Sequence, residues 1–149
     1  MIDKIHKVRG HRARGFTLVE VMITVAIVAI LSAVAVPQYS SYVTRGRLAE
    51  AFSSLGAVQP LAEQHWSNQR SYAGLGALNA FPRASQNFDY ALTAADAASY
   101  TVTATGKGSV LGFVFTIDQN GNRATTAAPS GWTANAGCWT DRKSGECIH

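Results

Sequence analysis

Hydrophobic residues are concentrated in one uninterrupted run near the start of the chain. Residues 16–36 read FTLVEVMITVAIVAILSAVAV, and Glu20 is the one ionisable residue among them. As an α-helix the run would be about 31 Å long at about 1.5 Å per residue, which is enough to cross the hydrocarbon core of a membrane. The pattern therefore predicts a helix over residues 16–36 that lies in lipid or among other apolar helices.

After Pro37 the helical pattern continues, but its hydrophobic residues are restricted to one face. They recur at spacings of three and four, a stripe suited to covering a sheet; its members are Leu48, Phe52, Leu55, Val58, Leu61, Ala62 and Trp66. Proline lacks an N–H and clashes with the preceding turn, so we expect a bend or local break at Pro37 and a second bend or an early end at Pro60. The helix is expected to end near Asn68.

The remainder of the chain has the pattern of a small antiparallel sheet. Residues 69–86 show no core pattern and are expected to form a connecting loop. Short alternating or β-branched runs follow and predict strands at 87–93, 99–106, 110–118 and 122–127. Asn120-Gly121 is a strong hairpin signal. The expected fold is α+β, with a long N-terminal helix packed on an antiparallel meander of about four strands.

Positive charge lies almost entirely before the apolar run. Residues 1–15 hold five basic residues and one acidic residue, which accounts for the whole net charge of +4, and residues 16–149 hold eight of each. The positive-inside rule then places the N-terminus in the cytoplasm and the residues after Pro37 across the membrane. A secretory signal peptide cleaved after Ala35 and a simple membrane anchor are two alternatives for the same segment.

Both alternatives leave Glu20 without an explanation. A carboxylate at the centre of a membrane span costs on the order of 3 kcal/mol, and such residues normally have a partner. No Lys, Arg or His occurs in residues 16–36. Cleavage after Gly15 would supply a positive group, because the freed α-amino group of Phe16 would lie one turn from Glu20. The carboxylate could then pair with the N-terminus of an adjacent copy and set the register of assembly.

The stretch from Arg14 to Ala51 resembles the N-terminal signature of type IV prepilins. Gly15, Phe16, Thr17, Leu18, Glu20 and Pro37 all lie where that pattern has them. The resemblance implies cleavage between Gly15 and Phe16 by a prepilin peptidase, N-methylation of Phe16, and an assembly role for Glu20 together with Phe16. It also implies a pilin fold, and a structural function in adhesion, twitching motility or DNA uptake.

Further expectations about domains and partners follow from the resemblance. They are a cleaved leader over residues 1–15, a transmembrane and assembly helix over 16–36, and a periplasmic or extracellular head over 37–149. The expected partners are other pilin subunits, prepilin peptidase, the pilus assembly machinery, and the inner membrane before assembly into an extracellular pilus.

Cys138 and Cys147 are the two cysteines, and both follow the last predicted strand. A location beyond the membrane makes a disulfide their natural state, and in type IV pilins a C-terminal cysteine pair brackets a surface loop. A metal site with His65 or His149 lacks the usual close ligand spacings. His65 is expected to be a half-buried packing residue. We expect no metal, no cofactor and no catalysis, because no nucleophile, phosphate-loop or zinc-protease motif occurs.

Two alternatives to a pilus fibre subunit remain open. A type II secretion pseudopilin shares the leader, Phe16 and Glu20, but major pseudopilins generally end in a calcium-binding loop without this cysteine pair. A pilus-associated DNA receptor would use Lys107, Arg142 and Lys143 as phosphate contacts. The balanced charge of residues 16–149 weighs against DNA binding. The sequence does not separate a major from a minor pilin.

Overall fold

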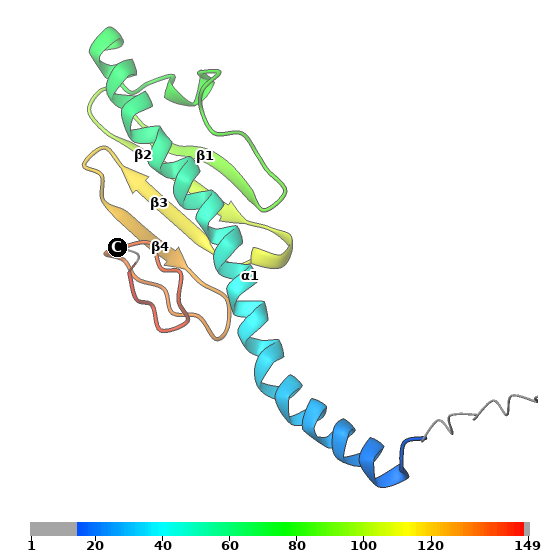
Figure 1. Cartoon of the computed structure of the whole chain (residues 1–149). Helices are drawn as coiled ribbons and strands as arrows, with labels where there is room; N and C mark the ends of the chain where they lie inside the picture. Colours follow the sequence, from blue (N-terminus) through cyan, green and yellow to red (C-terminus); the bar gives the residue numbers. More distant parts are fainter. Residues whose placement is uncertain (1–14, 148–149) are drawn as a thin grey trace, which may run out of the picture. The chain divides into compact units, whose positions relative to one another are not determined.

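The computed structural model describes residues 15–147 and contains one long helix and one sheet (Figure 1). It divides into two compact units, residues 1–39 and residues 40–149, and each is described by itself. The second unit is called the head below. Of the expected leader, only Gly15 lies among the described residues, and His149 lies outside them. The elements in chain order are helix α1 (Leu18–Gln69), 3-10 turn η1 (Leu75–Ala77), strands β1 (Phe88–Ala95) and β2 (Tyr100–Gly106), 3-10 turn η2 (Gly108–Val110), and strands β3 (Val114–Asp118) and β4 (Arg123–Ala127).

Helix α1 ends close to the predicted position but is uninterrupted at both prolines. Of the alternatives that the sequence left open, the structure thus excludes a local break at Pro37 and an early end at Pro60. A proline removes one intrahelical hydrogen bond. At Pro60 that loss is offset because Val58 and Ala62, on either side of it, are fully buried on the sheet.

The buried face of α1 follows most of the predicted stripe. Leu48, Leu55, Val58 and Ala62 are buried together with Ala51, and Phe52 and Leu61 pack against the same core. Trp66 departs from the prediction, because 37% of its surface is exposed. It lies in the last turn of the helix, where the guanidinium of Arg70 contacts its ring.

The sheet is the predicted antiparallel meander, with the order β1-β2-β3-β4. Side chains alternate between the core and the outer face, so that Val102 and Ala104 of β2 and Phe115 and Ile117 of β3 are buried against α1. The third strand begins at Val114 instead of residue 110, because η2 occupies the preceding residues. A side chain at Gly106 would collide with the carbonyl oxygen of Val110, so this close turn requires glycine.

The segment between α1 and β1 contributes more to the core than its sequence indicates. Leu75 in η1 is fully buried and Phe81 is nearly so. Both belong to the same hydrophobic cluster as the helix stripe. The periodicity of the sequence missed them because single apolar residues in a loop have no repeat for a pattern to detect.

Candidate assembly helix and disulfide-bounded loop

The first candidate site is the start of α1, where Thr17 caps the helix. The Thr17 hydroxyl oxygen accepts a hydrogen bond from the backbone N–H of Glu20 at 3.2 Å, and the Thr17 carbonyl accepts one from Val21 at 3.2 Å. Glu20 therefore occupies the third position of the first turn, the position typical of a capping-box glutamate. The positive end of the helix dipole favours a negative charge there.

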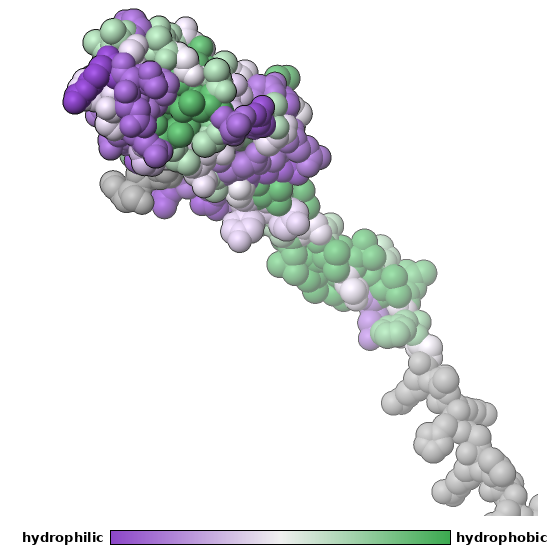
Figure 2. All heavy atoms as spheres, turned by 90° about the horizontal axis from the view of Figure 1, so that it is seen from above, coloured by the Kyte–Doolittle hydropathy of each residue, from purple (hydrophilic) through white to green (hydrophobic). Residues whose placement is uncertain are grey.

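The apolar part of α1 is exposed along its whole length. Phe16 is 81% exposed, and the large apolar residues that follow it in the helix are exposed as well. Figure 2 shows this part of the helix as an almost wholly hydrophobic surface. Its length and composition are sufficient to cross a membrane. Such a surface is stable only in contact with lipid or with other apolar helices.

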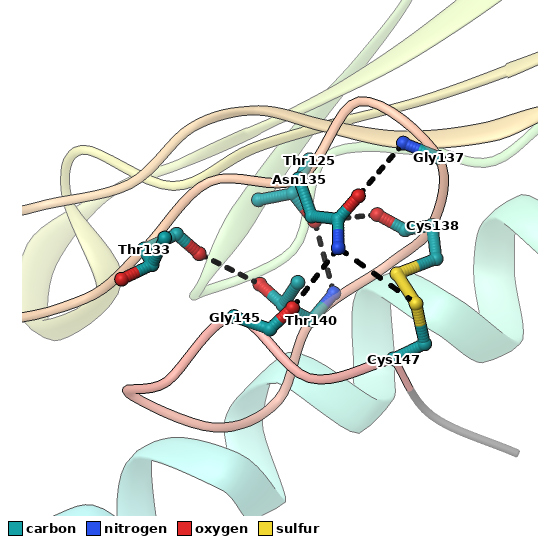
Figure 3. Close-up of a disulfide and its surroundings, with 8 residues drawn as sticks. All are labelled: Thr125, Thr133, Asn135, Gly137, Cys138, Thr140, Gly145 and Cys147. Carbon is teal, nitrogen blue, oxygen red and sulfur yellow. Dashed lines mark hydrogen bonds between the residues drawn. A yellow bond between two sulfur atoms is a disulfide. The ribbon is translucent and has the colours of Figure 1, made fainter.

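The second candidate site is the loop closed by the disulfide between Cys138 and Cys147 (Figure 3). The two Cα atoms are 5.6 Å apart. An isolated antiparallel bridge between Thr140 and Cys147 brings the two sides of the loop together. Residues 142–144 are exposed at its tip. We call residues 138–147 the disulfide loop.

The side chain of Asn135 ties the disulfide loop to the segment that precedes it. Its amide oxygen accepts a hydrogen bond from Gly137 N–H at 2.9 Å, and its amide nitrogen donates to the Gly145 carbonyl at 3.0 Å and to Cys147 Sγ at 3.8 Å. Figure 3 shows this amide between the two sides of the loop. One asparagine thus fixes the loop geometry beside the covalent cross-link.

Two buried threonines attach the same loop to β4. The Thr125 hydroxyl donates to the Cys138 carbonyl at 2.9 Å and accepts from Thr140 N–H at 2.9 Å. The Thr140 hydroxyl donates to the Thr133 carbonyl at 3.4 Å. Buried hydroxyls with partners of this kind stabilise a local structure without leaving polar groups unsatisfied. The disulfide loop is therefore a fixed part of the head surface.

Trp139 anchors the loop in the core, and the sequence analysis did not single it out. Its ring is stacked on Phe52 of α1 with centroids 5.5 Å apart, and its indole N–H donates to the Thr116 carbonyl at 2.8 Å. On the other side, Arg123 Cζ lies 4.7 Å from the centroid of the Trp139 ring. The sequence feature that could have indicated this role is a tryptophan placed directly after a cysteine.

The three cations predicted to contact DNA are not brought together. Arg142 and Lys143 lie at the tip of the disulfide loop, where Arg142 Nη1 is 2.9 Å from Glu146 Oε2. Lys107 follows β2, and its ammonium is 2.7 Å from a carboxylate oxygen of Asp89 in β1. Lys107 thus lies beside β1 and β2, whereas the disulfide loop is hydrogen-bonded to β4, the strand at the opposite edge of the sheet. Among residues 15–147, Lys143 has no ion pair.

Arg123 also contacts the disulfide loop, through Trp139. It begins β4, is exposed, and stacks on the tryptophan that anchors the disulfide loop. Periodicity could not reveal this, because contact between a strand and a distant loop is set by tertiary structure. We call Arg123, Arg142 and Lys143 the β4-side cations.

His65 is half-buried, as predicted, and one ring nitrogen lies 2.9 Å from the Ala73 carbonyl. This contact joins the last turns of α1 to the loop that follows them. Within residues 15–147, no three His, Cys, Asp or Glu side chains are grouped so that they could hold a metal ion.

A capped apolar helix, a four-stranded meander and a disulfide-closed C-terminal loop together define a pilin. Residues 10–36 match the prokaryotic N-terminal methylation motif. Residues 37–140, more than half of the chain, match the family described as type IV minor pilin ComP, DNA uptake sequence receptor. The chain belongs to this family, whose members are structural pilus proteins.

The sequence of this chain is also similar to those of known fimbrial proteins. The chain is 41% identical over 56 residues to the fimbrial protein EcpC of Eikenella corrodens, covering 38% of this chain and 37% of that protein. It is 35% identical over 74 residues to a probable minor fimbrial protein of Dichelobacter nodosus, covering 50% and 46%. The aligned part therefore spans less than half the length of these relatives.

The fold also matches a solved pilin. The crystal structure of the non-core minor pilin PilV of Neisseria meningitidis superposes with a TM-score of 0.50 at 16% identity, over 64% of this chain and 96% of that one. At this level of identity the likeness establishes the fold alone.

Proposed function

We propose that this chain is a minor subunit of a type IV pilus, made as a prepilin and cleaved between Gly15 and Phe16 by a prepilin peptidase. The match to the methylation motif supports N-methylation of Phe16. The basic residues before Phe16 support a cytoplasmic N-terminus, with residues 16–36 in the inner membrane until the assembly machinery transfers the subunit to the extracellular pilus.

Assembly with other pilin subunits proceeds through the exposed apolar part of α1. Burying this surface between helices replaces its contacts with lipid, and Glu20 pairs with the new N-terminus of a neighbouring subunit. The geometry supports this pairing because Thr17 already satisfies the Glu20 backbone N–H, while the carboxylate is left exposed at the head of the helix. The disulfide between Cys138 and Cys147 favours a pilus subunit over a secretion pseudopilin.

The specialised role that we propose is DNA binding by the head. The observation that carries it is the match of residues 37–140 to a family described as a DNA uptake sequence receptor. The β4-side cations supply a physical basis, because Arg123 contacts Trp139 of the same loop whose exposed tip carries Arg142 and Lys143. The neutral total charge of residues 16–149 weighs against DNA binding through overall attraction, but phosphates also respond to the local arrangement of charges.

Lys107 is the weakest of the predicted contacts. Its ammonium is already paired with Asp89, and it lies on the β1 side of the sheet. Arg142 is likewise paired with Glu146, so what separates Lys107 from the others is its distance along the sheet from the disulfide loop. The proposed contact set is therefore the β4-side cations, with Lys107 outside it.

The test is DNA binding by the full-length protein in detergent micelles, followed by fluorescence anisotropy of labelled duplex DNA. Changing both Arg142 and Lys143 to Ala should weaken binding at least severalfold. The slope of log affinity against log salt concentration should also become shallower by about one for each cation lost. Arg83→Ala is the matched control, because Arg83 is exposed beside Tyr90 and Leu92 of β1. Equal affinity of the double variant and the wild-type protein would contradict the assignment.

A further inference from the structure

We propose that Arg70, stacked on Trp66 at the end of α1, is a second DNA contact about one duplex turn away from the disulfide loop. This inference rests on the proposed DNA-binding function and adds to it a contact at the opposite end of the head. It would make the β4 side of the head a surface for a whole turn of DNA.

The backbone of Arg70 is the first observation. Arg70 has a φ of 53°, and it is the one non-glycine residue among residues 15–147 with a positive φ. It directly follows the last helical residue, where its N–H donates to the Trp66 carbonyl at 2.7 Å. Glycine or asparagine is usual at this position, and a larger side chain in the left-handed region costs about 1–2 kcal/mol. Glycine at this position would therefore make the fold more stable than arginine does.

The side chain of Arg70 is the second observation. Its Cζ lies 4.8 Å from the centroid of the Trp66 ring, and both residues are exposed. No carboxylate among residues 15–147 forms a salt bridge with Arg70. Contact with the indole restrains the guanidinium at an exposed position, where its N–H donors can reach a ligand. A pre-oriented, unpaired planar cation is suited to binding a phosphate.

The location of this pair on α1 is the third observation. Arg45, Phe52, Gln59 and Trp66 are spaced by seven residues, about two turns of helix, and so form one row along α1. Contacts show that the row faces the β4 side of the sheet: Phe52 is stacked on Trp139, and Gln59 lies against the Gly121 turn that leads into β4. We call this row the β4 flank of α1.

The β4 flank also carries the cations proposed to bind DNA. Near its start, Arg45 lines a pocket with Asp141 of the disulfide loop, next in sequence to Arg142. Midway along it, Arg123 stacks on Trp139, which in turn contacts Phe52. Arg70 stands at its end. Cationic groups therefore recur along one side of the head from the disulfide loop to the end of the helix.

The length of the flank matches the repeat of DNA. From Arg45 to Gln69, the residue before Arg70, the helix rises about 36 Å at about 1.5 Å per residue. One turn of B-form DNA measures about 34–36 Å. A duplex lying along the flank would present phosphates of the same groove edge to Arg142 at one end and to Arg70 at the other, without bending.

Between the β4-side cations and Arg70, the acidic side chain of Glu63 opposes this path, in addition to Asp141 and Glu146 at the disulfide loop. Glu63 is exposed and lies one turn after Gln59 and two turns before Arg70, which places it beside the same row. Its charge would repel a phosphate backbone passing between the β4-side cations and Arg70. Removing the charge of Glu63 should therefore raise the affinity for DNA, whereas removing that of Arg70 should lower it.

The experiment compares variants of the full-length protein in detergent, using duplexes of about 20 and about 6 base pairs. Arg70→Gly removes the guanidinium while placing the preferred residue at the left-handed position, so its thermal unfolding should equal or exceed that of the wild-type protein. We expect about a fivefold loss of affinity and a salt dependence lower by about one phosphate for the long duplex, and little change for the short one. Glu63→Gln should raise affinity for the long duplex.

Arg83→Ala is again the matched control and should bind both duplexes as the wild-type protein does. Wild-type affinity of Arg70→Gly for the long duplex would overturn this inference, as would an equal loss for both duplexes or no gain in Glu63→Gln. If Arg142 and Lys143 still matter in that case, the proposed DNA-binding function stands without the Arg70 contact. If the wild-type protein binds neither duplex, the proposed function itself fails.

Discussion

At the scale of the residue, burial of Tyr100 makes the head sensitive to alkaline pH. Tyr100 begins β2 with only 2% of its surface exposed, and its ring meets Tyr72 edge to face with centroids 4.9 Å apart. Burial raises the pKa of its hydroxyl to about 12, and the neighbouring charges of Tyr72, Asp118 and Glu63 act in the same direction. The neutral phenol is thus the form that the folded head accommodates.

This pKa predicts the direction of a stability change. In the unfolded chain Tyr100 loses its proton near pH 10, whereas in the folded head it keeps the proton until about pH 12. Between these values the unfolded state binds fewer protons, so the free energy of unfolding should fall with rising pH, by up to about 1.4 kcal/mol per pH unit. Urea unfolding followed by tryptophan fluorescence at pH 9 and pH 11 measures the fall.

The control for this prediction is Tyr100→Phe, which keeps the ring and removes the titrating hydroxyl. Its unfolding free energy should decline less between pH 9 and pH 11 than that of the wild-type protein. Tyr90, whose pKa is also raised mainly by burial, accounts for part of the remaining decline. Identical slopes for the variant and the wild-type protein would refute the assignment to Tyr100.

At the scale of the element, the disulfide loop is held by a covalent cross-link, by hydrogen bonds and by an anchored tryptophan. The cross-link closes a short loop, which on the chain-entropy model stabilises the folded state by roughly 2–3 kcal/mol. Changing Cys138 and Cys147 together to Ser should lower the free energy of unfolding by that amount. Ser144→Ala, at the exposed tip of the same loop, serves as the unaffected control.

The hydrogen bonds of Asn135 make a separate contribution to the same element. Asn135→Ala keeps the disulfide but leaves the Gly137 N–H and the Gly145 carbonyl without their partner. We expect a loss of about 1–2 kcal/mol in unfolding free energy, measured by urea denaturation with the cysteines oxidised. A loss as large as that of the double cysteine variant would mean that Asn135 directs formation of the cross-link itself.

At the scale of the whole molecule, assembly should depend on Glu20 and processing should not. Glu20→Gln keeps the size and the helix start but removes the charge, so we expect normal cleavage after Gly15 and reduced incorporation into pili. Mass spectrometry of the N-terminal peptide checks processing, and immunoblotting of sheared pili checks incorporation. Wild-type incorporation of the variant would exclude the proposed charge pairing.

The whole fold could be predicted from the sequence wherever a repeat was present. The apolar run is marked by its length, the helix stripe by its spacing and the strands by alternating or β-branched residues, and the structure contains the helix and all four strands. The sequence left open or missed what a single residue does through tertiary contact. Pro60 stays within α1 because its neighbours are buried, and Leu75 and Phe81 fill the core from a loop.

The candidate site was only partly predictable for the same reason. Arg142, Lys143 and the cysteine pair were evident because they are close in sequence. Arg123 joins them only through Trp139, and Arg70 is distinguished only by its backbone angle and by its contact with Trp66. Neither property can be read from a residue name, since both depend on where the chain folds back.

The bridge between Thr125 and Asn135 has a consequence for aggregation. β4 is an edge strand, and its outer N–H and C=O groups at Thr125 are occupied by Asn135, whose side chain is bonded to the disulfide loop. An edge strand without such a cover is a template for pairing with other chains. Newly made chains that have not yet closed the cross-link should therefore be more prone to pair edge to edge through β4, and timely oxidation should reduce this pairing.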